Sequence, residues 1–281
     1  MSEKTVLLEV SAGVAVLALN RPEKLNAFAG DMRDQLNARL DDVASSTEAR
    51  VLVVTGAGRA FCSGGDVEHM SRLAERGAPF EELAPLLEAG EGVVRRIAAL
   101  PLPVIAAVNG VAAGAGANLA LACDVRLASD AAKLGETFVR IGLHPDWAGS
   151  WHLPRLAGVA KSLDLCWTGD LIEAGEAQRL GIFQRVWLAA SFEREWRDYA
   201  ARLAAGPQVA IRSAKASLRA APDRGLEESL AAERAAQERC WRSPDAAEGV
   251  KAFVEKRAPV FASSVPEDGE TAPSHAARIF E

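Results

Sequence analysis

Short runs of β-forming residues open the chain, and a segment of helical period follows them. Thr5–Val10 and Val14–Leu19 are rich in aliphatic and β-branched residues, and Ser11-Ala-Gly13 between them predicts a hairpin. Asp31–Val43 has apolar residues three or four positions apart, which predicts a helix with an acidic first turn. Val51–Thr55 is a short apolar run typical of fully buried strands. The amino-terminal third is therefore expected to mix strands with a helix.

The helical spacing between residues 68 and 96 is interrupted several times. Gly77, Pro79, Pro85 and Gly90 fall inside it, and both residue types weaken a helix interior. We therefore expect broken helices in this segment. Beyond it, the sequence predicts a helix at Ala115–Ala122 and short strands at Val125–Ala128 and Lys133–Leu134.

From Ser191 onward the pattern is helical throughout. The candidate helices are Ser191–Ala205, Pro207–Arg219, Leu226–Trp241 and Pro244–Glu255. This shift predicts a boundary near Ala205-Gly206-Pro207, with a mixed α/β core over residues 1–205 and a helical domain over residues 206–262. Residues 263–281 hold two prolines, several charges and no apolar period, so we expect a disordered tail.

The composition favours an enzyme of the cytoplasm that acts on small molecules. The chain has 281 residues and a formal net charge of −6, which argues against a surface for nucleic acid or for an anionic membrane. The four cysteines are widely spaced, so neither a metal site nor a disulfide framework is indicated. The first residues lack the apolar core of a signal peptide. The apolar stretch Val104–Cys123 contains two asparagines and three glycines, which favours a buried strand, turn and helix over a membrane span.

Two glycine-rich stretches, each after a β-forming run, carry the strongest chemical signal. They are Val51–Asp66 and Pro103–Ala117. Loops without bulky side chains let a ligand lie against the main chain, where unpaired N–H groups at a helix start stabilise negative charge. Two such loops predict an oxyanion hole. A dinucleotide fingerprint does not fit, because Phe61 and Leu119 stand where its third glycine is needed, and no Gly-Lys pair exists for a phosphate loop.

Four separated segments, in order, resemble the crotonase family, the enoyl-CoA hydratase/isomerase superfamily. They are Asn20–Ala27, Ala60–Asp66, Asn109–Ala120 and Gly249–Lys256, and the resemblance runs from about Val6 to Phe261. It implies a spiral core of repeated ββα units followed by a helical trimerisation domain. It also implies an acyl-CoA thioester as substrate, no metal or further cofactor beyond the CoA moiety, and a homotrimer or a hexamer built as a dimer of trimers.

The resemblance also assigns roles to residues of this chain. The thioester oxygen would lie between the amides of Gly65 and Ala115. The CoA moiety would contact Lys24, Leu25 and Ala27, together with Asp66 and Val67 beside the first glycine loop. Phe253 and Lys256 match positions that often reach the CoA of a neighbouring subunit. Five of these residues also have a plain structural interpretation: Gly65 as a turn glycine, Lys24 as a solvated lysine, Asp66 as bonded to backbone, and Phe253 and Lys256 as a helix anchor with an exposed charge.

The chain departs from the hydratase pattern at both catalytic glutamates. Those positions fall on Asn118, which cannot accept a proton at neutral pH, and on Phe138. Glu136 lies two residues before Phe138 and is expected to face another direction. Asp146 coincides with the position where several non-hydratase members carry a working aspartate, and we expect it to be the acid/base, with Asn118 orienting substrate or donating a hydrogen bond.

The runs around Asn109–Leu121, Gly142–Asp146 and Leu153–Gly158 most resemble the ring-epoxide isomerases of phenylacetyl-CoA breakdown, which also move double bonds in enoyl-CoA. The expected activity is therefore proton-shuttling isomerisation of an enoyl-CoA or of a ring-epoxide aryl-CoA. Two alternatives remain open: an enoyl-CoA hydratase that uses Asp146 or Glu136 with water, and a non-catalytic acyl-CoA binding subunit. The acyl group is not readable from the sequence.

Overall fold

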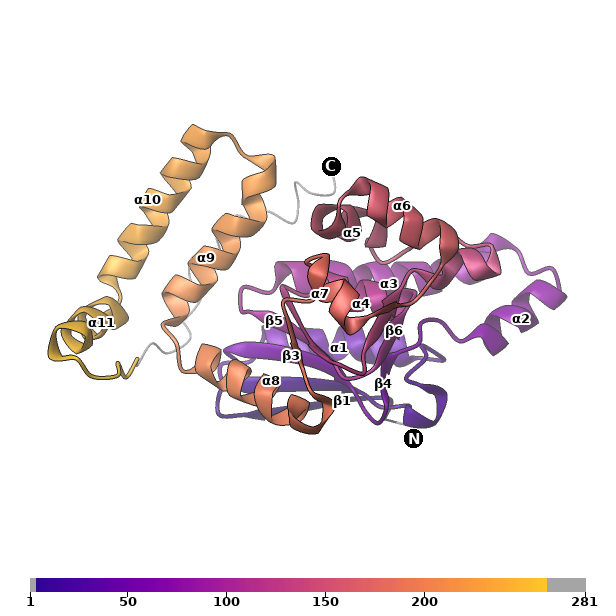
Figure 1. The fold of residues 1–281 in the computed structure, drawn as a ribbon, viewed down its shortest axis with the longest axis horizontal. Coiled ribbons are helices and arrows are strands. Elements are labelled where there is room, and N and C mark those ends of the chain that lie inside the picture. Colours follow the sequence, from indigo (N-terminus) through magenta and orange to yellow (C-terminus); the bar gives the residue numbers. More distant parts are fainter. Residues whose placement is uncertain (1–3, 262–281) are drawn as a thin grey trace.

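The computed structural model describes residues 4–261, and it contains two β-sheets wrapped by helices (Figure 1). The tail expected at residues 263–281 lies outside the described residues. The larger sheet has the strand order β1 (Val6–Ser11), β2 (Val14–Leu19), β3 (Val51–Gly56), β5 (Val104–Val108), β7 (Val125–Ser129) and β10 (Arg185–Trp187). Its neighbours are parallel except for β1 and β2. These two form the hairpin that was predicted, with Ser11 opposite Val14 and a turn at Ala12 and Gly13.

The strands of the smaller sheet lie in chain order, as do the strands of the larger sheet. It contains β4 (Ala60–Cys62), β6 (Val111–Ala113), β8 (Lys133–Gly135) and β9 (Ile172–Glu173). The pairs β3–β4, β5–β6 and β7–β8 each place their first strand in the larger sheet and their second in the smaller sheet. Parallel pairing within each sheet then stacks these pairs as successive turns. The fold is thus the mixed α/β spiral of ββα units that the resemblance implied.

Both faces of the larger sheet are buried at its central strands β3 and β5. On β3, Leu52 and Val54 belong to the main core, whereas Val51 and Val53 pack with Trp196 of α8 (Ala189–Ala204). Alternate side chains of a strand point to opposite faces, so helices must cover both. This explains the continuous apolar run that predicted a buried strand. The main core also includes the apolar stripe of α1 (Met32–Ala44), the helix predicted at 31–43.

Helices α2 (Val67–Glu75) and α3 (Phe80–Ala99) replace the series of broken helices expected between residues 68 and 96. The chain breaks at Gly77 and Pro79 as expected, but α3 continues through Pro85 and Gly90, which corrects the expectation there. Gly90 is explained by packing: a Cβ at this position would lie 2.1 Å from Nε1 of Trp147. The small residue makes room for an indole ring and does not end the helix.

The segment between residues 136 and 181 holds short elements that the sequence pattern did not predict. They are the 3-10 helix η2 (Thr137–Ile141) and the helices α5 (Gly149–Ala157), α6 (Val159–Thr168) and α7 (Ala174–Arg179). Gly158 separates α5 from α6, and Pro154 lies inside α5. Helices this short contain too few turns to show a clear period. A second 3-10 turn, η1 (Pro22–Lys24), precedes α1.

The predicted carboxy-terminal helices are all present. After α8 come α9 (Gln208–Ala220), the 3-10 turn η3 (Ala221–Asp223), α10 (Leu226–Arg242) and α11 (Pro244–Glu255). Figure 1 shows α10 and α11 as an arm that extends away from the sheets. Asp124 forms two ion pairs that hold α9 against the core. Its Oδ2 atom lies 2.8 Å from Nζ of Lys215, and its Oδ1 atom lies 2.6 Å from Nη2 of Arg219. The division into domains at residue 205 stays a prediction. Within residues 4–261, no helix is long and apolar enough to cross a bilayer.

Helix α4 (Ala115–Ala122) starts directly after β6, and its backbone lies against β4. Every residue of this helix is buried. A Cβ on Gly116 would lie 2.2 Å from the carbonyl oxygen of Cys62. Real Cβ atoms do not approach a backbone oxygen that closely, so the contact between α4 and β4 requires glycine.

We therefore expect Gly116→Ala to destabilise the protein. Adding a methyl group to a well-packed interior costs about 1–3 kcal/mol, which outweighs the gain of up to about 1 kcal/mol from replacing a helical glycine. Gly175→Ala is a matched control, because Gly175 also lies in a helix and a Cβ there would meet nothing within 4 Å. Denaturant unfolding of both variants measures the difference. Equal midpoints for the two variants would contradict the close backbone contact.

Candidate active site

The two glycine loops leave the smaller sheet side by side. Strands β4 and β6 are parallel neighbours, with Cys62 paired to Ala112, so the residues that follow each strand emerge at the same edge. A Cβ on Gly64 would lie 2.8 Å from the carbonyl oxygen of Ala113 and 3.6 Å from the amide nitrogen of Ala115. Gly64 also has φ of +100°, a conformation that glycine adopts without strain. The two loops are therefore in direct backbone contact.

The amides of Gly65 and Ala115 lack hydrogen-bond acceptors among residues 4–261. On either side of Gly65, the N–H of Phe28 donates to the carbonyl of Gly64, and the N–H of Asp66 donates to the carbonyl of Phe28. Ala115 is the first residue of α4, where backbone N–H groups have no partner within the helix. The structure thus brings the two predicted amides to adjacent loops and leaves both free to donate.

Asp146 lies in the loop between η2 and α5, and its backbone is tightly held. Its carbonyl oxygen accepts hydrogen bonds from the N–H of Gly149 at 3.0 Å and from Nδ2 of Asn118 at 2.9 Å. The next two residues, Trp147 and Ala148, have φ of +48° and +59°. Trp147 is buried, with its ring 4.6 Å from that of Phe28. These contacts fix the direction in which the Asp146 side chain leaves the chain.

The Asp146 carboxyl is half-buried, and burial raises its pKa to about 6. The positive charge of Arg33 acts in the opposite direction and limits this rise. Oδ1 of Asp146 has no hydrogen-bond partner among the described residues. At neutral pH the group is therefore ionised, yet it binds a proton far more readily than an aspartate in water.

Arg33 was not among the residues singled out from the sequence. It extends from α1, is 7% exposed, and lies with its guanidinium carbon 5.3 Å from the centre of the Phe28 ring. Its Nη2 atom would be 3.9 Å from a Cβ on Gly65. Asp146 and the first glycine loop therefore share one buried cation. The sequence did carry a signal for it, because Arg33 falls on the same helical stripe as the buried Leu36 and Leu40.

Glu136, Asn118 and the main chain of Asp146 are connected by hydrogen bonds. Glu136 and Asn118 are fully buried, and Nδ2 of Asn118 lies 3.3 Å from Oε2 of Glu136. Burial raises the pKa of Glu136 to about 8, the hydrogen bond from Asn118 opposes the rise, and the charge of Asp146 adds to it. The expectation that Glu136 faces another direction than Phe138 stays a prediction, but Glu136 does contact Asn118. It lies between β8 and η2 with φ of −89° and ψ of 72°, so neither helical nor strand spacing describes its direction.

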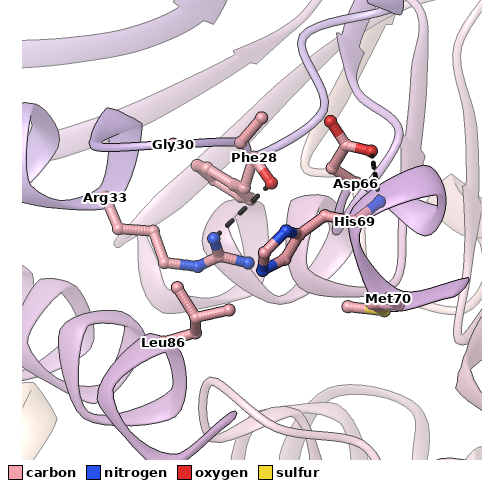
Figure 2. Close-up of a pocket in the computed structure, with 8 residues that line it drawn as sticks. Phe28, Gly30, Arg33, Asp66, His69, Met70 and Leu86 are labelled. Atoms are coloured by element: carbon pink, nitrogen blue, oxygen red, sulfur yellow. Dashed lines mark hydrogen bonds between the residues drawn. The ribbon is translucent and has the colours of Figure 1, made fainter. Parts of the chain in front are cut away.

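A cavity of about 190 Å³ opens beside the first glycine loop (Figure 2). Its apolar wall includes Phe28, Met70 and Leu86, and its polar residues are Arg33, Asp66 and His69. Met70 borders Gly65 directly, since a Cβ on Gly65 would lie 2.5 Å from the Met70 methyl carbon. A cavity of this size accommodates a small hydrocarbon ring or chain.

The predicted CoA positions near the first loop form a connected surface. Lys24 is half-exposed and forms an ion pair with Glu68 at 2.7 Å. Leu25 has φ of +51°, and its carbonyl accepts the N–H of Ser63 at the start of the glycine loop. Ala27 is buried next to it. The segment that contains Lys24 and Leu25 is therefore held against the loop by backbone contacts.

Three other predicted positions have clear structural settings. Oδ1 of Asp66 accepts the N–H of His69 and caps α2, which agrees with its interpretation as a backbone-bonded residue, and Val67 is exposed next to it. Phe253 is 86% exposed and Lys256 ends α11 with φ of +54°. Figure 1 shows α11 at the outer end of the arm, remote from β4 and β6. This chain does not bring Phe253 and Lys256 to its own site.

Comparison with known proteins places the chain among enzymes of one family. It matches the family described as Enoyl-CoA hydratase/isomerase over residues 9–264. A probable enoyl-CoA hydratase of Rhodobacter capsulatus is 44% identical over 93% of this chain and 99% of its own length. The 1,2-epoxyphenylacetyl-CoA isomerase of Escherichia coli is 40% identical over 91% of this chain and 97% of its own length.

A solved structure agrees with the sequence relatives. The crystal structure of enoyl-CoA hydratase from Bacillus anthracis superposes with a TM-score of 0.85 and 31% identity, covering 92% of this chain and 98% of that one. Both hydratases and an isomerase are thus among the relatives, so the comparisons do not choose between the two reactions. The chain belongs to the enoyl-CoA hydratase/isomerase family.

Proposed function

We propose that this enzyme binds an acyl-CoA thioester, stabilises its enolate between the amides of Gly65 and Ala115, and isomerises it with Asp146 as the acid/base. The substrate is an enoyl-CoA or a ring-epoxide aryl-CoA. The observation that carries the proposal is one ionised, half-buried carboxyl, Asp146, whose pKa is lowered by the charge of Arg33, a residue that also borders the Gly65 loop. The base and the predicted oxyanion hole are therefore both close enough to Arg33 to be influenced by its charge.

The chemistry follows from where negative charge develops. When Asp146 removes a proton from the carbon chain next to the thioester, the electron pair moves onto the thioester oxygen. The N–H groups of Gly65 and Ala115 then donate to that oxygen, and each such donor contributes about 3 kcal/mol to transition-state stabilisation. The carboxyl formed on Asp146 returns the same proton to another carbon of the enolate. The double bond moves, and no water or redox partner is consumed.

Arg33 supports the ionised state of the base. Burial alone favours the neutral form of Asp146, and the guanidinium charge counters this effect. The result is a base whose pKa lies close to the pH at which it works, which favours both removal and return of a proton. Arg33 also lines the cavity that we assign to the acyl group.

The CoA moiety is assigned to the surface beside the first glycine loop. Lys24 supplies a cation for phosphate, and Leu25, Ala27, Asp66 and Val67 border the path toward Gly65. Phe253 and Lys256 are assigned to the CoA of a neighbouring subunit in a trimer or hexamer. Their exposure at the tip of the arm supports this assignment, because an apolar side chain as exposed as Phe253 gains stability when another chain covers it.

Enoyl-CoA hydratase is the second candidate function, and one observation favours it. Glu136 provides a second carboxyl group near Asp146. Asn118 links the two residues, because its Nδ2 group donates to the Glu136 carboxyl and to the main-chain carbonyl of Asp146. Hydration needs two groups that exchange the proton of a bound water. The isomerase proposal has the simpler requirement of one carboxylate, which matches the half-buried Asp146 beside a fully buried Glu136.

Asp146→Asn should abolish isomerisation of a 3-enoyl-CoA while CoA thioesters still bind. Losing the general acid/base lowers kcat by about 10²- to 10⁴-fold, and the amide keeps the shape of the side chain. Asp198→Asn, at an exposed position of α8, is the matched control. Steady-state kinetics and calorimetric binding of a saturated acyl-CoA check both parts. Full activity in the Asp146 variant would contradict the assignment of Asp146 as the acid/base.

The rate of isomerisation should fall at acidic pH. Asp146 acts as a base only when ionised, and its pKa is about 6. Below that pH, kcat/KM should therefore decrease by about tenfold per pH unit. Assays between about pH 5 and pH 7 measure the decrease. A constant rate across this interval would exclude a base with the pKa of Asp146.

Hydration of crotonyl-CoA should be slow compared with isomerisation. The two positions that match the hydratase glutamates hold Asn118 and Phe138, so no pair of carboxylates faces a water molecule there. Incubation with 2-enoyl-CoA, 3-enoyl-CoA and aromatic-ring CoA esters, followed by product analysis, measures the preference. A hydration turnover comparable with the isomerase rate would support the hydratase instead, and binding without turnover of any ester would support a binding subunit.

A further inference from the structure

Glu136 is a fully buried carboxyl group that the isomerase proposal does not use. It follows β8, and its side chain is 0% exposed. Oε2 accepts a hydrogen bond from Asn118, whereas Oε1 has no partner among the described residues. An ionised carboxylate in such a place would lose its hydration without gaining an ion pair. Burial without an ion pair therefore favours the neutral, protonated form of Glu136.

Asn118 connects Glu136 to the main chain of Asp146. Its Nδ2 group donates one hydrogen bond to Oε2 of Glu136 at 3.3 Å and another to the Asp146 carbonyl at 2.9 Å. An amide nitrogen has two hydrogens, so both are used. A Cβ on Gly149 would lie 2.3 Å from Oδ1 of Asn118. The amide is therefore held on both sides and has little freedom to rotate.

The backbone beyond Asp146 needs such support. Trp147 and Ala148 both have positive φ, a conformation that is unfavourable for residues other than glycine. The surrounding structure must offset this unfavourable conformation. The hydrogen bond from Asn118 to the Asp146 carbonyl acts at the start of this strained segment, so it helps to determine where the Asp146 carboxylate points.

The proton on Glu136 also limits the negative charge in the cluster. The titratable groups that interact electrostatically with Glu136 are Asp146 on the loop before α5 and Cys166 on α6. The pKa of Cys166 is raised to about 11, so this thiol is neutral near pH 7. With Glu136 protonated, Asp146 is the only negative charge among these three groups, and the cation Arg33 acts on it. Loss of the Glu136 proton would place a second negative charge beside a reaction that itself develops negative charge.

We propose that Glu136 is a positioning residue for Asp146: its protonated carboxyl anchors the amide of Asn118, and Asn118 holds the main chain of Asp146 so that the carboxylate faces the substrate. This inference rests on the proposed function, in which Asp146 is the base. It adds a second, alkaline limit to activity, set by the ionisation of Glu136 near pH 8.

Two variants distinguish the role of the Asn118–Glu136 hydrogen bond from the role of the proton on Glu136. In Glu136→Gln, the amide oxygen still accepts from Asn118, but no charge can form. We expect kcat/KM to stay within about threefold of the original enzyme at neutral pH, and the original enzyme's decrease of about tenfold per pH unit above pH 8 to be absent. In Glu136→Leu, a side chain of similar size lacks an acceptor, so kcat should fall about ten- to a hundredfold with KM little changed. Glu233→Gln, at an exposed position of α10, is the control.

Unfolding measurements test the proton independently of activity. The folded pKa of Glu136, about 8, lies above its ordinary value of 4.5, so the folded protein retains a proton that the unfolded chain releases. The stabilisation is complete below pH 4.5 and is lost as the pH rises toward 8. Denaturant unfolding across this interval should therefore show a steeper loss of stability in the original enzyme than in Glu136→Gln.

The outcomes distinguish this inference from the proposed function. Identical alkaline profiles for the original enzyme and Glu136→Gln would overturn the inference, as would an unchanged kcat in Glu136→Leu. A steeper pH dependence of unfolding in the original enzyme, combined with loss of its alkaline decrease in Glu136→Gln, would support it. Absence of isomerase activity in the original enzyme would instead reject the proposed function, while the unfolding data would still report whether Glu136 holds its proton.

Discussion

The candidate site depends on direct contact between the backbone of α4 and the backbone of β4. Gly116 permits this contact, because any side chain would overlap the Cys62 carbonyl. The approach places Ala115, whose N–H group has no acceptor within residues 4–261, next to the loop that carries Gly65. The donors for an anion are therefore main-chain groups held by the packing of two rigid elements, and no side-chain rotamer has to be selected to form them.

Charge balance is the second condition on the site. One buried cation, Arg33, and two carboxyl groups, Asp146 and Glu136, lie in a region largely removed from water. Because Glu136 holds its proton at neutral pH, the cation faces one carboxylate and the cluster is close to neutral. An interior of this kind accepts the charge of an enolate at less cost than one that already contains two negative groups.

Local sequence features predicted the parts of the fold that local forces determine. The hairpin at residues 6–19, the buried strand at residues 51–56 and the four carboxy-terminal helices follow from turn chemistry and periodicity. The glycine loops indicated an oxyanion hole, and the family resemblance assigned its two amides. Tertiary contacts determined the rest. Gly90 does not interrupt α3, and its lack of a side chain makes room for Trp147. Glu136 reaches Asn118 because the chain there is neither strand nor helix. Arg33 was visible as a cation on an apolar stripe, but only the folded chain shows what surrounds it.

Helix α3 has two residues with different roles, Leu86 and Gly90, one turn apart on the same face. Leu86 lines the cavity, whereas Gly90 receives the ring of Trp147, the residue that follows Asp146. Residues four positions apart are neighbours on a helix but remain separate side chains. Substitution at residue 86 can therefore reshape the cavity while the packing of the Trp147 ring against residue 90 stays intact. In the proposed isomerase, residue 86 is thus a position where the substrate range can change without moving the segment that carries Asp146.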